Sequence, residues 1–418
     1  MPDAFHLLLN KYYPSFFSAP ENSIINQNFT FAFNLGEVDK LLTGFSKQFY
    51  GFNDSKVNGA LNTMNGGNLL LNINIPEAGY LNYGVQDLQV KGEGNFSKVN
   101  ISTSIGKVLS GKNVILENPL ILASSGHDTS FVKVDLAAED TSSLDGFYAR
   151  LVTVQEGLKI NFLNSAFTVN ERQWNVTPGN EIYWSKNFLT VKNLRITRND
   201  QRITVETNEF NPDESKFIIT LKNLNLADVI PTQLFSTRVE GITDGTIHIA
   251  DPTQNLDINT ALRTRELRID NDSIGILNID GTYHHQTGNA TFNIQSDNEG
   301  KAFLAQGKVG LSAANNGIDA TIKLNGTSIS LLNKYLAGYV SHLSGAVTGN
   351  LNIGGTTRVP SVKGSLTLDT VGVTVDYLGT HYRIPKLNVN VDDNLIEFGN
   401  FLLINKYNSK GTASGYIS

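Results

Sequence analysis

The chain has 418 residues, of which 40% are apolar and only 17% are charged, and its formal net charge is −6. A chain of this length exceeds what one ordinary hydrophobic core organises, so we expect several domains or a repeating architecture. The absence of any run of Lys and Arg argues against nucleic-acid binding. The absence of cysteine excludes disulfides and thiolate metal sites.

Both ends of the sequence read as cuts within a longer protein. Met1–His6 lacks the basic segment and apolar core of a signal peptide, and no stretch approaches the ~18 apolar residues of a membrane span. Gly411–Ser418 stops inside a strand-like pattern. We therefore interpret the chain as a fragment from which targeting segments are missing.

Alternation of apolar and polar residues dominates the chain and predicts β-strands, because successive side chains of a strand point to opposite faces. The pattern recurs at residues 29–35, 69–75, 158–162, 256–258, 267–269, 371–375 and 387–391. Turn residues such as Asn65-Gly66-Gly67 and Gly179-Asn180 separate these runs. At one strand per roughly 8–12 residues the chain holds some 30 strands. So many strands predict an all-β fold whose sheet curls or splits.

Three short segments carry a helical pattern instead. They are residues 37–49, residues 227–235 and, most clearly, residues 330–343, where Leu332, Leu336 and Leu343 fall on one stripe. Ser330 is a candidate N-cap, and Gly345 follows the predicted end of the helix.

Two of these segments are followed by stretches of similar sequence. Gly241, Gly245, Ile247 and Ile249 recur as Gly345, Gly349, Leu351 and Ile353, each 104 residues further on. The match predicts a repeated module, a helix followed by strands, stacked edge to edge. We expect Gly241 and Gly345 to occupy equivalent positions where the helix meets the first strand. We divide the chain into an N-terminal sheet module (1–150), connecting strands (151–223), repeat module A (224–326) and repeat module B (327–418).

Matches to known nucleotide-binding and metal-binding motifs are weak in this sequence. Gly106, Gly111 and Lys112 have phosphate-loop spacing, but Asn113 replaces the Ser/Thr and a strand follows, so we predict a strand turn. His284 and His285 are neighbours on a strand and point to opposite faces, which disfavours a shared metal. Asp270–Asp272 reads as a β-turn and lacks the later ligands of a calcium loop.

Trp174 and Trp184 flank a turn and are predicted to pair on the sheet, with ligand stacking as the alternative. We identify no catalytic residue, no cofactor site and no metal site, and we expect a protein that is not an enzyme.

Several segments resemble the TamB family, the translocation and assembly module proteins of bacterial envelopes, which are related to the AsmA-like proteins. The segments are Leu331–Gly345, Gly349–Gly355, Pro360–Leu366, Tyr377–Tyr382, Ile396–Phe398 and Gly411–Ile417. Trp174–Ile203 is similar to Bacteroidota-type members. The resemblance implies an elongated antiparallel sheet curled into an open trough with an apolar concave face.

The same resemblance implies a role and a location. The role is a periplasm-spanning scaffold for protein secretion, outer-membrane protein assembly and phospholipid transport between the membranes. The partners are phospholipid acyl chains, an Omp85-type outer-membrane protein, and the inner membrane through an anchor that this fragment lacks. A repetitive β adhesin or a surface-layer segment is the alternative, because periodicity alone does not separate a trough from a sandwich or solenoid.

If the trough exists, alternation predicts which residues line it. The expected groove-lining residues are Leu267, Ile269, Leu351, Ile353, Leu366, Leu368, Leu387 and Val389. The residues between them face water, because one step along a strand reverses the face. They are Arg268, Asn352, Thr367 and Asn388.

Overall fold

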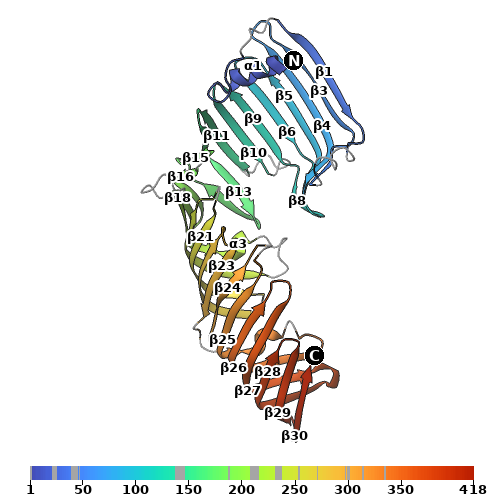
Figure 1. Cartoon of the computed structure of the whole chain (residues 1–418), viewed down its shortest axis with the longest axis vertical. Coiled ribbons are helices and arrows are strands. Elements are labelled where there is room, and N and C mark those ends of the chain that lie inside the picture. The colour runs from blue at the N-terminus through green and yellow to red at the C-terminus, as the bar shows by residue number, and fades with distance from the viewer. Residues whose placement is uncertain are drawn as a thin grey trace. The chain divides into compact units, whose positions relative to one another are not determined.

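The computed structural model describes most of the chain (Figure 1). The described residues are 2–20, 26–38, 46, 48–136, 146–186, 189–207, 216–230, 238–252, 255–270, 272–296, 298, 302–312, 315–333 and 336–418. Strands account for 72% of the described residues and helices for 5%, which confirms the all-β prediction. The thirty strands of the described residues belong to one antiparallel sheet. The sheet is open, since within this part of the chain β1 pairs only with β3 and β30 only with β29.

The chain forms two compact units. Unit 1 comprises Met1–Asn199 with Thr204–Thr207, and unit 2 comprises Asp200–Ile203 with Asn208–Ser418. β18 (Gln201–Thr207) contributes residues to both. The other elements of unit 1 are α1 (Pro2–Tyr12), β1 (Asn28–Leu35), β2 (Phe49–Gly51), β3 (Ser55–Asn62), β4 (Asn68–Tyr80), β5 (Tyr83–Gly94), β6 (Val99–Ser104), β7 (Lys107–Ser110), β8 (Asn113–Glu117), β9 (Leu120–Gly126), β10 (Thr129–Asp135), β11 (Gly146–Val154), β12 (Gly157–Phe162), β13 (Ser165–Val169), β14 (Arg172–Val176), β15 (Glu181–Ser185), β16 (Leu189–Lys192) and β17 (Leu194–Arg198).

Helix α1 covers part of the apolar face of unit 1, where Figure 1 shows it lying across the strands. Its Ala4, Leu8 and Tyr12 recur at i, i+4 and i+8, so they form one stripe, and all three are buried. They pack on Leu61 of β3 and Val99 of β6. Pro2 suits the first helical position, because a backbone N–H at this position would have no acceptor within the helix and its loss costs nothing. This helix was not predicted from the sequence.

Unit 2 is a meander in which each strand from β19 to β29 pairs with the next one. Its elements are β19 (Lys216–Asn225), α3 (Leu226–Val229), β20 (Val239–Ala250), β21 (Asp257–Ile269), β22 (Asp272–His284), β23 (Asn289–Ser296), β24 (Ala302–Gly310), β25 (Ile318–Ser328), η2 (Ile329–Leu332), β26 (Val340–Gly355), β27 (Pro360–Val375), η3 (Asp376–Leu378), β28 (Thr380–Asp392), β29 (Leu395–Asn405) and β30 (Lys410–Ile417). One continuous run of strands therefore passes through both predicted repeats.

The predicted helix over 330–343 is wrong. The structure has one 3-10 turn, η2, and strand β26 already begins at Val340. Val340 pairs with Val375 on the neighbouring strand, so cross-strand pairing overrides a helical pattern that local sequence favours. The segment 227–235 is helical only in α3, and 231–237 lie outside the described residues. Most of the segment 37–49 also lies outside them, and Phe49 begins β2.

The 104-residue repeat is confirmed in the backbone. Gly241 and Gly345 both have positive φ, 149° and 124°, and both lie beside a break in strand register. They lie inside β20 and β26 and not at a helix–strand junction, so that detail of the prediction is wrong. The repeat includes the short helices, since Asn225 caps α3 and Ser328 caps η2 in the same way.

Candidate apolar groove

A continuous apolar row crosses unit 2 from strand to strand. Each member lies directly opposite the next in the strand register, and we call this row the apolar stripe. It comprises Gly245, Leu262, Ile279, Ile294, Ala305, Ile322, Leu351, Gly364, Val391 and Ile396. The row has no charged or polar side chain, and its Ala, Val, Ile and Leu members are half-buried. A core between two layers buries such residues fully, so the stripe lacks a complete second layer.

The opposite face of the same strands is polar. Thr321 donates to Asn352 at 3.2 Å and Thr367 donates to Asn388 at 3.1 Å, in cross-strand ladders of uncharged groups. Lys363 lies 2.8 Å from Asp392, and its hydrogen bond to that carboxylate raises the pKa of Lys363. This face meets water.

Six of the eight groove-lining residues predicted from the sequence lie on the stripe's face in β26–β28. Leu366 lies opposite Val389, and Leu368 lies opposite Leu387. Leu351 is a member of the stripe, and Ile353 is the next residue of β26 on the same face. Leu387 and Val389 are buried, whereas the other four are half-buried.

Leu387 and Val389 are buried in a cluster to which the segment after β25 contributes. Ile329 of η2 packs into a cluster with Leu343, Val347, Val371, Val373, Ile384, Leu387 and Val389. Val391 and Ile396 of the stripe pack against this cluster.

Leu267 and Ile269 differ in burial. They follow a bulge at Glu266, where φ is 53°, and they correspond in the repeat to Val371 and Val373. Leu267 is 5% exposed and Ile269 is 38% exposed. The members of the stripe on β22–β25 were not predicted from the sequence, although alternation at 277–283, 290–294 and 318–324 carries the same signal.

The chemical motifs show the geometry of turns and strands. Lys107–Ser110 and Asn113–Glu117 form a hairpin, which confirms the strand turn predicted at the phosphate-loop match. His284 and His285 are both exposed, and His284 Nδ1 lies 3.2 Å from Asp257. In the described residues no group of three or more His, Asp or Glu side chains could hold a metal ion. In the same part of the chain, no helix combines the length and apolarity needed to span a membrane.

The two tryptophans do not pair, so that prediction is wrong. Trp174 lies opposite Phe167 and is buried. Trp184 lies opposite Leu158 and Leu189 and is 55% exposed. The reason is that the two strands have different neighbours. β14, which carries Trp174, pairs with β13 and β17, whereas β15, which carries Trp184, pairs with β12 and β16.

Comparison with known proteins matches a family model to the region that holds most of the stripe. Residues 171–368 match the family model described as TamB, N-terminal domain. The chain has no significant match among curated proteins or among solved structures. The matched residues contain the stripe from Gly245 to Gly364 and the two glycines of each repeat. The chain thus carries, over residues 171–368, a domain of the TamB family.

Proposed function

We propose that this protein is a TamB-type scaffold of the bacterial cell envelope whose apolar stripe carries phospholipid acyl chains between membranes. The observation that carries the proposal is the coincidence of a TamB domain with a continuous, half-buried apolar row. Roles in protein secretion and in outer-membrane protein assembly accompany this proposal, and the protein acts as a scaffold and not as an enzyme.

The energetics of the stripe favour an acyl ligand. Apolar surface left in water is unfavourable, and each CH₂ of a chain that it buries contributes about 0.8 kcal/mol. The stripe extends from β20 to β29 without a charge, so an acyl chain meets no desolvation barrier along it. The polar face on the other side of the same strands is solvated and keeps the sheet soluble.

The proposed location is the periplasm. There the scaffold spans from an inner-membrane anchor to an Omp85-type outer-membrane protein. The TamB domain supports both of these partners. Nucleic acid is not a proposed partner.

The experiment compares two aspartates on adjacent residues of β26. Leu351→Asp places a charge in the stripe, and Asn352→Asp places the same charge on the polar face, where Thr321 can still donate to it. The purified variants and the parent chain are extracted gently and analysed by native mass spectrometry for bound phospholipid. Thermal unfolding of each variant is measured in parallel.

The expected result is phospholipid bound to the parent and to Asn352→Asp, and lost from a folded Leu351→Asp. Folding of Leu351→Asp is expected because a charge on an open face still reaches solvent. A parent chain without phospholipid, or a Leu351→Asp variant that binds as much as the parent, contradicts the proposal. Gross unfolding of Leu351→Asp also contradicts it, because it shows a closed core.

A further inference from the structure

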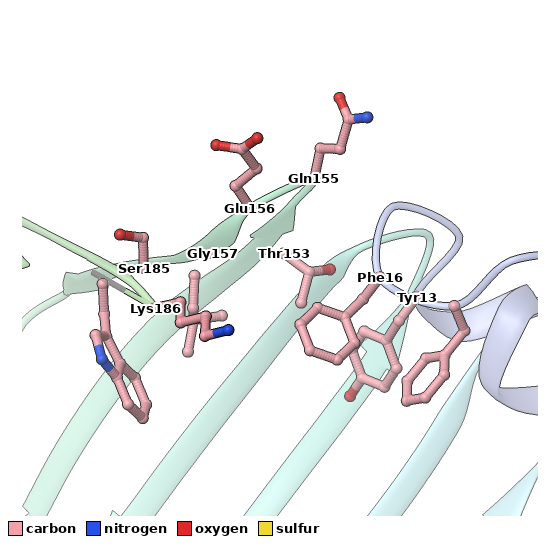
Figure 2. Close-up of a pocket in the computed structure, with 11 residues that line it drawn as sticks. Tyr13, Phe16, Thr153, Gln155, Glu156, Gly157, Ser185 and Lys186 are labelled. Atoms are coloured by element: carbon pink, nitrogen blue, oxygen red, sulfur yellow. The ribbon is translucent and has the colours of Figure 1, made fainter. Parts of the chain in front are cut away.

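A second apolar feature lies in unit 1, away from the stripe. It is an open cleft of about 750 Å³ beside the turn between β11 and β12 (Figure 2). One wall is the segment after α1, with Tyr13, Phe16 and Phe17, and the other wall is formed by Leu158 and Trp184. Its volume falls in the range of about 300–1,000 Å³ typical of sites for a single small ligand.

Hydrogen bonds hold the wall that follows α1 in place on the sheet. The Tyr13 hydroxyl lies 3.1 Å from Ser130 Oγ on β10. The backbone N–H and the hydroxyl of Ser15 donate to the Asp128 carboxylate at 3.0 and 2.8 Å. Thr153, which also lines the cleft, donates to the same carboxylate at 2.8 Å. Asp128 therefore joins the segment after α1 to strand β11.

The second wall of the cleft is a cross-strand row. Thr153 lies opposite Leu158, and Leu158 lies opposite Trp184, so the three side chains share one face of the sheet. One aromatic side chain on each wall is poorly covered: Phe16 is 63% exposed and Trp184 is 55% exposed. Large aromatic side chains gathered around a cavity and left unburied are typical of a ligand site.

One charged group reaches into the cleft. In Figure 2 the Lys186 side chain extends toward Thr153, whereas Glu156 and Gln155 point away from the aromatic rings. Within the described part of the chain, Lys186 makes no ion pair, so its ammonium is available to an anion at the mouth of an apolar cleft.

We propose that this cleft binds one single-chain anionic amphiphile, with its acyl chain along Phe16, Leu158 and Trp184 and its anionic head at Lys186. A fatty acid and a lysophospholipid both have this chemistry. A neutral apolar ligand would leave the Lys186 charge unused, and a sugar would bring its hydroxyl groups against a lining that is mostly apolar.

The chain provides its own reporter for the test. It contains two tryptophans, of which Trp174 is 1% exposed and Trp184 lines the cleft. The probe is dibromostearate below its micellar concentration, because bromine quenches tryptophan on contact, and unbrominated stearate is the control ligand. Trp184→Phe leaves only the buried tryptophan as fluorophore. Trp174→Phe leaves only the reporter in the cleft.

Dibromostearate should quench the parent and Trp174→Phe and should leave Trp184→Phe unquenched. Lys186→Gln should weaken binding of the acid about fivefold, as expected for an exposed ion pair, without affecting the methyl ester. Affinity should rise by up to about fourfold per added CH₂ until the chain fills the cleft.

Quenching of Trp184→Phe equal to that of the parent overturns the proposal, as does equal loss of acid and ester affinity in Lys186→Gln. Displacement by a peptide ending in Phe, with no binding of stearate, would make the cleft a peptide site and also overturn it. Leu351→Asp, in the stripe of unit 2, should leave the quenching unchanged. The two proposals can therefore fail separately. The cleft is tested by tryptophan quenching, whereas the apolar stripe is tested by the amount of bound phospholipid.

Discussion

Gly245 and Gly349, 104 residues apart, occupy the same backbone position in the two repeats. Their φ angles are 144° and 151°. A Cβ on Gly245 would lie 2.2 Å from the carbonyl oxygen of Ala261, and a Cβ on Gly349 would lie 2.2 Å from that of Ser365. In both repeats the neighbouring strand approaches more closely than any side chain permits. The repeated glycine is therefore required by the strand pairing.

The first prediction follows from this contact. Gly349→Ala should destabilise the protein by about 3 kcal/mol, because it combines a strained φ with a backbone clash. The measurement is urea unfolding followed by circular dichroism. Gly354→Ala is the matched control in the same strand, since nothing lies within 4 Å of its Cβ position, and its effect should stay below about 1 kcal/mol. Equal effects of the two substitutions would show that the clash is relieved by local movement.

The second prediction concerns the packing of α1 on the apolar face of unit 1. Leu8 is 2% exposed and its neighbour Leu9 is 40% exposed. Leu8→Ala should cost about 2–4 kcal/mol, because it opens a cavity against Leu61 and Val99. Leu9→Ala should cost well under 1 kcal/mol. Hydrogen exchange of the α1 amides is the measurement, and unchanged protection in Leu8→Ala would contradict the packing.

Sequence periodicity predicted the strands, the repeat and the two faces of unit 2 because these depend on local alternation. It failed at 330–343, where Leu332, Leu336 and Leu343 match a helix, but from Val340 onward the chain pairs with β27 as a strand. It also missed the cleft in unit 1. That site joins Phe16 to Trp184, and no local pattern reports a contact between segments so far apart in the chain.

The third prediction concerns alkaline pH. Burial raises the pKa of Tyr12 to about 12, and its hydroxyl donates to the Asn95 carbonyl oxygen at 2.7 Å. An unfolded tyrosine has a pKa near 10, so the folded state holds the proton more tightly. This contribution to stability is complete below pH ~10 and is lost as the pH rises through about 12.

The test of Tyr12 is the difference in unfolding free energy between the parent and Tyr12→Phe from pH 9 to 12. The Phe variant should lose about 1 kcal/mol at neutral pH, the value of one hydrogen bond, and should show a shallower decline at alkaline pH. Tyr416→Phe, at a position that is 72% exposed, should follow the parent. Parallel declines for the parent and Tyr12→Phe would refute the assignment.

The last prediction concerns a buried polar pair on the face that carries the apolar stripe. Thr243 and Thr264 lie opposite each other, both 3% exposed, and their hydroxyls are 2.9 Å apart. In the second repeat the same pair of positions holds Val347 and Leu368, so an apolar pair suits this backbone.

Either single Thr→Val variant should cost about 1–2 kcal/mol, because it leaves one buried hydroxyl without its partner, whereas the double variant should be close to the parent. The coupling energy, measured by urea unfolding of all four proteins, should be about 1 kcal/mol or more. Purely additive losses would show that the two hydroxyls do not depend on each other. If the coupling is found, the double variant makes the face more apolar without loss of stability, and it should bind at least as much phospholipid as the parent.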